Sequence, residues 1–167
     1  MSLEEKVQYV LDRWEIQDKI ALYGLGQDLH QSGAENKNIL AQWSDLFTPD
    51  ATIDVTSLNV GKFGLYEYAE LMRGKGLKGG GLEAMYDAWQ HLEGHATVTI
   101  DGDTATSLAL HLHTHQAKDG AHNLFDAGYW HDKWVRTDKG WRIKERVHQS
   151  LYTNTFPVVK GPPFLRD

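Results

Sequence analysis

Residues 89–105 read WQHLEGHATVTIDGDTA, and this stretch decides the fold. We expect residues 91–100 to form a strand and Asp101-Gly102-Asp103 to turn the chain back, because an Asp-Gly pair between alternating residues is a hairpin signal. The returning strand, residues 104–116, alternates between two faces. Leucines occupy one face, and the other face carries Ala109, His111, His113 and His115. The stretch therefore begins an antiparallel meander.

The rest of the chain divides into helices before this hairpin and strands after it. Two further strands are expected at residues 124–136 and 141–155, joined by a turn. Helices are expected at residues 3–31, 38–47, 65–73 and 82–89, with one short strand at residues 51–55. This order predicts the α+β class, with a curved antiparallel sheet wrapped on one face by N-terminal helices around an internal pocket.

The first helix carries two apolar stripes and one carboxylate of interest. The change of phase near Trp14 predicts a bend or two consecutive helices. Asp28 follows Ile20 by eight residues, so it lies on or beside the inward face. A carboxylate there is costly without a partner, although an Asp near a helix end can also be capping or solvated. The first stripe is Val7, Val10, Leu11 and Trp14, and the second is Ile16, Ile20 and Tyr23.

Residues 74–81 contain five glycines in eight positions. Such a segment is typical of a flexible linker. Its place just before an aromatic segment also suits a lid that closes a cavity. Both interpretations stay open.

Composition limits the class of protein. The 167 residues fit one domain, residues 1–167. The chain has no cysteine and a net charge of -6, which disfavours disulfides, thiolate metal sites and binding to nucleic acid. No apolar run approaches the length of a membrane span, and the first residues do not resemble a secretory signal. We therefore expect a cytoplasmic protein that binds neither nucleic acid nor membrane.

Several short motifs occur in a recognisable order along nearly the whole chain. The chain resembles the SnoaL-like branch of the nuclear-transport-factor-2-like superfamily, whose fold is a cone around a pocket. Within it, the layout is similar to scytalone dehydratase and hexachlorocyclohexane dehydrochlorinase. The motifs are IQDKI at 16–20, Tyr23 followed by Asp28, LFTPDA at 46–51, HLEGH at 91–95, DGDTA at 101–105, GYWHD at 128–132 with Arg136, and GWRI at 140–143.

The resemblance implies an elimination reaction without a cofactor, carried out by an Asp–His pair. It places the helix Asp on Asp28, the strand His on His91 and an inward arginine on Arg136. An imidazole is a suitable base near neutral pH, and a carboxylate behind it fixes the tautomer and stabilises the imidazolium. We expect a lyase of the dehydratase type acting on a hydrophobic cyclic or aromatic molecule. Alternatives are an isomerase or cyclase with the same pair, and a non-catalytic ligand-binding domain like an oxygenase small subunit.

Six further residues are candidates for substrate binding. His95 shares strand parity with His91. In the third strand, Asp132 and Arg136 share one face with two indoles, where they form either an internal ion pair or a polar contact to substrate. Tyr23 either donates a hydrogen bond to substrate or packs in the core. The six candidates are Tyr23, His95, His113, Trp130, Asp132 and Arg136.

A metal site is the alternative use of the histidines on the second strand. His111, His113 and His115 lie on one face and could bind an ion. Neighbouring residues on one strand rarely converge on an ion without ligands from elsewhere, so we expect no metal and no cofactor. An open sheet face favours a homodimer or homotrimer.

Overall fold

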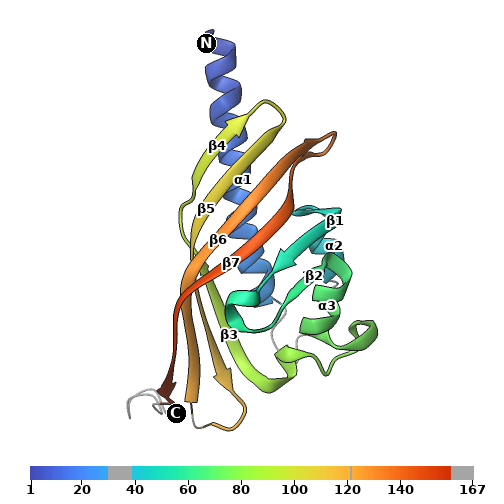
Figure 1. Ribbon diagram of the computed structural model, residues 1–167, viewed down its shortest axis with the longest axis vertical. Coiled ribbons are helices and arrows are strands. Elements are labelled where there is room, and N and C mark those ends of the chain that lie inside the picture. The colour runs from blue at the N-terminus through green and yellow to red at the C-terminus, as the bar shows by residue number, and fades with distance from the viewer. Residues whose placement is uncertain (30–38, 121, 159–167) are drawn as a thin grey trace.

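The computed structural model describes residues 1–29, 39–120 and 122–158 (Figure 1). The expected connection at residues 31–37 and the tail at residues 160–163 lie outside these ranges. The helices are α1 (Leu3–Leu29), α2 (Ile39–Trp43), α3 (Leu65–Arg73) and the short 3-10 turns η1 (Thr56–Leu58), η2 (Lys75–Leu77) and η3 (Leu82–Met85). The strands are β1 (Phe47–Asp54), β2 (Lys62–Gly64), β3 (Tyr86–Glu93), β4 (Thr97–Asp101), β5 (Thr104–Ala117), β6 (His122–Thr137) and β7 (Gly140–Pro157).

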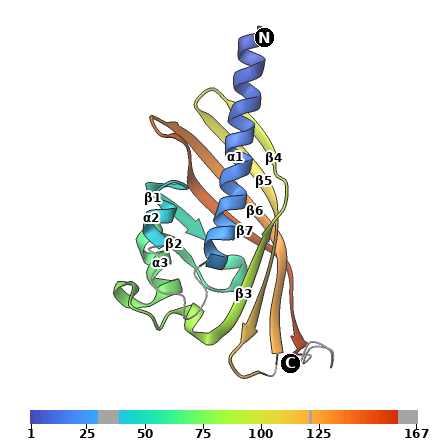
Figure 2. The same ribbon diagram turned by 180° about the vertical axis from the view of Figure 1, so that it is seen from behind.

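These strands form one curved sheet in the order β2-β1-β7-β6-β5-β3, and β4 pairs with β5 beside β3. All pairs are antiparallel except β1 with β7, so the sheet is mixed and the predicted purely antiparallel sheet is wrong at this pair. The long strands β5, β6 and β7 sweep along the molecule, α1 crosses one face of the sheet, and α2 and α3 lie beside β1 (Figures 1 and 2). The predicted α+β class and the sheet wrapped by helices are confirmed.

Helix α1 is a single element of 27 residues, so the predicted bend near Trp14 is wrong. Its second stripe, Ile16, Ile20 and Tyr23, is buried against the sheet. Trp14, from the first stripe, is 65% exposed within the chain. The side of α1 that faces the sheet here carries Asp12, which is buried and binds Arg136 and Trp141, so the first stripe points away from the sheet.

The segment before the predicted hairpin differs from the expectation in two ways. The expected helix at residues 82–89 is only the 3-10 turn η3, and strand β3 already begins at Tyr86. The expected strand at residues 91–100 is broken after Glu93, and β4 starts at Thr97. Both β3 and β4 pair with β5, along residues 111–117 and 104–108 respectively. The turn at Gly102, whose φ is +57°, is confirmed.

The expected helix at residues 38–47 is also shorter than predicted. Helix α2 ends at Trp43, residue 38 lies outside the described ranges, and Phe47 already belongs to β1. Phe47 pairs with Ile143 of β7, and pairing resumes only at Thr52 after an irregular stretch. Pro49 lies in that stretch, where its missing N–H interrupts no ladder.

Strand β5 carries its leucines on the outer face of the sheet. Leu108 and Leu110 are exposed, whereas His111 and His113 on the opposite face are buried. The alternation predicted from the sequence is therefore correct, but the face that points inward is the histidine face. The largest fully buried hydrophobic side chains come from α1, α2, β6, β7, and β1 with the residue just before it, and they are Ile16, Ile20, Tyr23, Ile39, Trp43, Leu46, Phe47, Ile53, Trp134, Trp141 and Ile143.

The glycine-rich segment packs against the end of α3. Gly79 donates its backbone N–H to the carbonyl of Arg73 at 2.7 Å, and a Cβ on Gly81 would meet the carbonyl oxygen of Met72 at 2.3 Å. The segment therefore needs glycine for a close backbone approach, and its role as a lid stays a prediction. Within the described residues, none of the helices has the length and apolar character that crossing a membrane requires.

Candidate active site

A cavity of about 350 Å³ lies between the inner face of the sheet, the C-terminal part of α1 and helix α3. Its volume falls in the range typical of small-molecule pockets. One side of its wall is polar, and most of that side is histidine. The rest is apolar or aromatic and consists of Val55, Leu58, Val60, Leu71, Met72, Leu82 and Leu124 with Tyr23, Tyr68, Tyr86 and Trp130.

The predicted pair of Asp28 and His91 forms at the wall of this cavity. His91 Nδ1 lies 2.8 Å from Asp28 Oδ1. The backbone N–H of His91 also donates to Oδ1 at 2.9 Å and to Oδ2 at 3.1 Å. Since the carboxylate accepts from Nδ1, the proton of the neutral ring lies there and Nε2 keeps its lone pair. The side chain of His91 is 8% exposed and that of Asp28 is 22% exposed.

The pair forms because β3 packs directly on the last turns of α1. The indole N–H of Trp89 donates to the backbone carbonyl of Gln27 at 2.8 Å. A Cβ on Gly24 would lie 2.8 Å from Cγ of Glu93, so only glycine permits this approach of helix and strand. The close approach at Gly24 and the predicted inward position of Asp28 thus bring the carboxylate to the strand.

Five histidines gather on this side of the cavity, from three strands. His91 on β3 pairs across the strands with His113 on β5, and their ring centroids are 5.4 Å apart. His111 and His115 lie on the same face of β5, and His148 on β7 completes the group. The ring of Tyr86 stacks on that of His115 at 4.4 Å.

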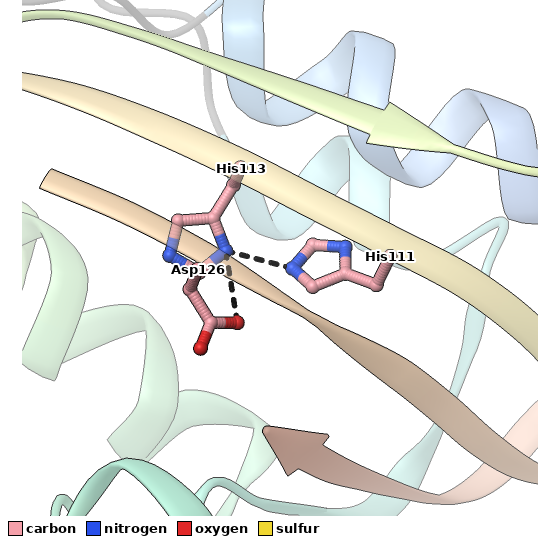
Figure 3. Close-up of side chains that lie close together, drawn as sticks. All are labelled: His111, His113 and Asp126. Carbon is pink, nitrogen blue, oxygen red and sulfur yellow. Dashed lines mark hydrogen bonds and ion pairs between the residues drawn. The ribbon is translucent and has the colours of Figure 1, made fainter. Parts of the chain in front are cut away.

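Two carboxylates anchor the group from opposite ends. Glu93 accepts from His111 Nδ1 at 3.0 Å, and His111 Nε2 lies 2.8 Å from His113 Nδ1 (Figure 3). Asp126 on β6 has its Oδ2 at 3.9 Å from His113 Nδ1 and 3.0 Å from His148 Nε2. The result is a continuous chain of polar contacts along the inner face of the sheet.

Burial sets the charge states in this group. It lowers the pKa of His111 to about 2 and that of His115 to about 3, and it holds the pKa of His113 well below its usual value. Burial raises the pKa of Glu93 to about 7. For Asp126, burial opposes ionisation, but hydrogen bonds from His148 and Ser150 outweigh it and lower the pKa. The second-strand histidines are therefore neutral at physiological pH.

Three of the predicted substrate-binding residues lie on the cavity: Tyr23, His113 and Trp130. Tyr23 packs edge-on against Trp130, and its hydroxyl accepts from Gln27 Nε2 at 3.1 Å. Burial raises the pKa of Tyr23, so its phenol stays protonated. These rings form the floor of the cavity beneath the histidines.

The other three predicted substrate-binding residues, His95, Asp132 and Arg136, do not line the cavity, so their predicted positions are wrong. His95 is exposed in the break between β3 and β4, where the strand parity with His91 no longer applies. Asp132 does not pair with Arg136 but binds Arg146 through two contacts of 2.8 Å. Arg136 lies at the far end of the sheet and binds Asp12 at 2.7 and 2.8 Å. That contact lowers the pKa of Asp12 to about 2.

Arg146 is the buried arginine beside the cavity that the prediction missed. Its guanidinium lies 4.1 Å from the ring centre of Tyr23 and 4.9 Å from that of Trp130. Neither Arg146 nor its partner Asp132 has any exposed side-chain area. The ion pair therefore supports the aromatic floor from behind instead of reaching a ligand.

One β-bulge explains why the sequence did not place Arg146 and His148. Trp134 pairs with Ile143, but Lys133 pairs with Glu145, so Lys144 is an extra residue in β7. A bulge reverses the alternation beyond it. A strict alternation from Ile143 would turn Arg146 and His148 outward. Asp126, by contrast, shares parity with Trp130 along β6, and that signal was available.

Comparisons with known proteins agree with this architecture. Residues 8–147 match the SnoaL-like domain model, so the chain belongs to the SnoaL-like family. An uncharacterized protein of Mycobacterium tuberculosis is 29% identical over 147 residues, which is 87% of this chain and 90% of that protein.

Two solved structures share the fold. A putative scytalone dehydratase from Novosphingobium aromaticivorans has a TM-score of 0.70 at 18% identity, covering 97% of this chain and 99% of its own. A hexachlorocyclohexane dehydrochlorinase from Novosphingobium barchaimii has a TM-score of 0.73 at 15% identity, covering 95% and 99%. At these identities the likeness extends to the fold alone.

Proposed function

We propose that this protein is a lyase of the dehydratase type, which acts on a hydrophobic cyclic or aromatic molecule through His91 and Asp28. The single observation that carries the proposal is the 2.8 Å contact between His91 Nδ1 and Asp28 Oδ1 at the wall of the cavity. The contact leaves Nε2 as a base with a fixed orientation. The predominantly apolar and aromatic lining favours a ring system over a charged substrate.

In the proposed reaction, His91 Nε2 removes a proton from a carbon next to a carbonyl group. The electrons of that C–H bond form the new double bond, and the bond from the neighbouring carbon to its hydroxyl group breaks. The imidazolium returns the proton to the departing hydroxyl, so water leaves. Asp28 stabilises the imidazolium between the two steps. Neither step needs a redox group or a cofactor.

The solved structures of similar fold support this choice of reaction class. One is named as a putative scytalone dehydratase and another as a hexachlorocyclohexane dehydrochlorinase, and both names describe an elimination. Tyr23, Trp130 and His113 are the proposed substrate contacts, since all three line the cavity beside His91.

The reaction class is tested with a bicyclic β-hydroxy ketone, 3-hydroxy-1-tetralone, followed by mass spectrometry. We expect loss of one water to give 1-naphthol, because elimination and tautomerisation make the ring aromatic. A product of unchanged mass would favour isomerisation by the same pair. If neither turnover nor binding occurs with this ketone and its unhydroxylated parent, the proposed substrate class is wrong.

We also propose that a second copy of the chain covers the outer face of the sheet. Leu110 is 58% exposed and Leu151 is 53% exposed there, beside Leu108 and Tyr152. Large apolar side chains exposed on one face of a sheet are typical of an interface. Light scattering is expected to give a homodimer or homotrimer, and Leu110→Glu is expected to shift it toward monomer. Lys139→Glu, in the β6–β7 turn, is the control; a monomeric wild type at micromolar concentration would contradict the proposal.

A further inference from the structure

We propose that His111, His113 and Asp126 bind a divalent transition metal ion of the zinc class inside the cavity. This goes beyond the elimination proposed above, whose proton transfer needs no metal. It also revises the metal-free pocket expected from the sequence. All three residues are buried and line the cavity.

The three ligand atoms are spaced as a tetrahedral site requires. Zn–N bonds of 2.0–2.1 Å at tetrahedral angles place two ligand atoms about 3.3 Å apart. His111 Nε2 and His113 Nδ1 are 2.8 Å apart, and His113 Nδ1 lies 3.9 Å from Asp126 Oδ2 (Figure 3). All three atoms lie within 4.8 Å of one another. Small side-chain rotations are sufficient to hold an ion. They need only move the two histidine nitrogens slightly apart and bring Asp126 Oδ2 slightly closer to His113 Nδ1.

His111 is already oriented as a metal ligand. Both oxygens of Glu93 lie close to its Nδ1, at 3.0 and 3.1 Å, so the ionised carboxylate accepts from that nitrogen and leaves Nε2 with its lone pair. Metal-binding histidines almost always donate their other ring N–H to such a partner, which fixes ring and tautomer. The side chains of both residues are 1% exposed, so water does not compete for this contact.

Asp126 supplies a carboxylate oxygen that lies between the rings of His113 and His148. Its contacts among the described residues are the hydroxyl of Ser150 at 2.5 Å and the rings of His148 and His113. Among these residues, no Lys or Arg forms an ion pair with it. A buried carboxylate is costly without a compensating charge. A divalent cation between this carboxylate and two neutral imidazoles provides that charge.

The outer contacts hold Asp126 in place for this role. His148 Nδ1 lies 2.8 Å from the hydroxyl of Ser57, and its Nε2 lies 3.0 Å from Asp126 Oδ2. His148 therefore acts as the positioning partner of the carboxylate, with three residues left as direct ligands. The fourth coordination position faces the cavity, where an oxygen of a bound molecule can occupy it.

The sequence argued against a metal because His111 and His113 come from one strand. The ligand from elsewhere is Asp126, which lies directly opposite His113 in the β5–β6 ladder. The position opposite His111 is Gly128, where a Cβ would meet the backbone carbonyl oxygen of Gln149 at 2.1 Å, so glycine permits the close approach of β7. The sheet register therefore supplies the third ligand.

Direct metal binding tests the proposal without any activity assay. The protein, with its affinity tag removed, is stripped with a chelator, titrated with zinc chloride by calorimetry and then dialysed for elemental analysis. We expect one zinc per chain at micromolar or tighter affinity. His113→Gln and Asp126→Asn are each expected to weaken binding at least about 10- to 100-fold, because each removes a ligand. His131→Gln, on the exposed face of β6, is the control.

A second measurement covers the case in which these variants do not fold. Cobalt chloride added to the wild-type protein is expected to give the intense visible absorption of four-coordinate Co²⁺, and zinc chloride is expected to remove it by competition. Zinc binding of less than one ion per chain would overturn the proposal. Zinc affinity that is unchanged in His113→Gln would also overturn it, as would a cobalt spectrum typical of octahedral coordination.

Discussion

Replacing His91 with alanine is expected to lower kcat/KM for dehydration of 3-hydroxy-1-tetralone by about 100- to 10,000-fold, the range typical of losing a general base. The side chain lies at the cavity wall, and its Nε2 is the proposed base. Since alanine removes the base but keeps the strand, the far-UV circular dichroism is expected to stay that of the wild type. Steady-state kinetics on the purified variant measure the effect.

Asp28→Asn is expected to cause a loss of at least about 100-fold, although the two side chains have nearly the same shape. An amide in place of the carboxylate no longer stabilises the imidazolium and can present an N–H to Nδ1, which favours the wrong tautomer. His95→Ala is the matched control, because this histidine is exposed and only four positions from His91. Normal kcat/KM in both His91→Ala and Asp28→Asn would contradict the proposed pair.

The second large effect is on stability, at the buried ion pair behind the aromatic floor. Arg146→Met is expected to lower the free energy of unfolding by about 3–5 kcal/mol, because Asp132 would remain buried without its charged partner. For a chain of this length, that corresponds to a fall in Tm of roughly 6–20 °C. Thermal and urea unfolding, followed by circular dichroism, measure it.

Two further variants separate two contributions to the free energy of unfolding. One is the penalty for leaving Asp132 buried without a partner, and the other is the net stabilisation by the Arg146–Asp132 ion pair. Arg146→Met with Asp132→Leu is expected to recover most of the lost stability, since neither charge is then buried. Lys144→Met, in the same strand, breaks only a partly exposed pair with Asp50 and is expected to cost no more than about 1 kcal/mol. An Arg146→Met protein as stable as the Lys144→Met protein would contradict this account.

Much of the fold could be predicted because its signals are local. The alternation in β5, the Asp-Gly turn at Gly102 and the helical period around Ile20 each require only a few neighbouring residues. The errors came from non-local effects. Trp14 belongs to an apolar stripe, but the sheet meets the face of α1 that carries Asp12 and Ile16, so Trp14 is exposed. Residues 86–89 were expected to be helical, but their pairing with β5 extends β3 instead.

The candidate site could be predicted where side chains alternate strictly along a strand and where the helical period is regular. The helical period placed Asp28 on the inward face, the family resemblance paired it with His91, and the structure brings the two residues into contact. His148 and Arg146 could not be placed, because the bulge at Lys144 reverses the alternation in β7. The true partner of Asp132 was missed for the same reason.

The most direct test of the central claim is solvent exchange into 1-tetralone, which has the activated C–H group but no hydroxyl to lose. Proton NMR in D₂O follows the loss of its signal next to the carbonyl, so the measurement isolates proton abstraction at His91. The wild-type protein is expected to accelerate exchange, and His91→Ala is expected to reduce the rate at least about 100-fold, toward that of buffer. Exchange by His91→Ala at the wild-type rate would contradict the assignment of His91 as the base.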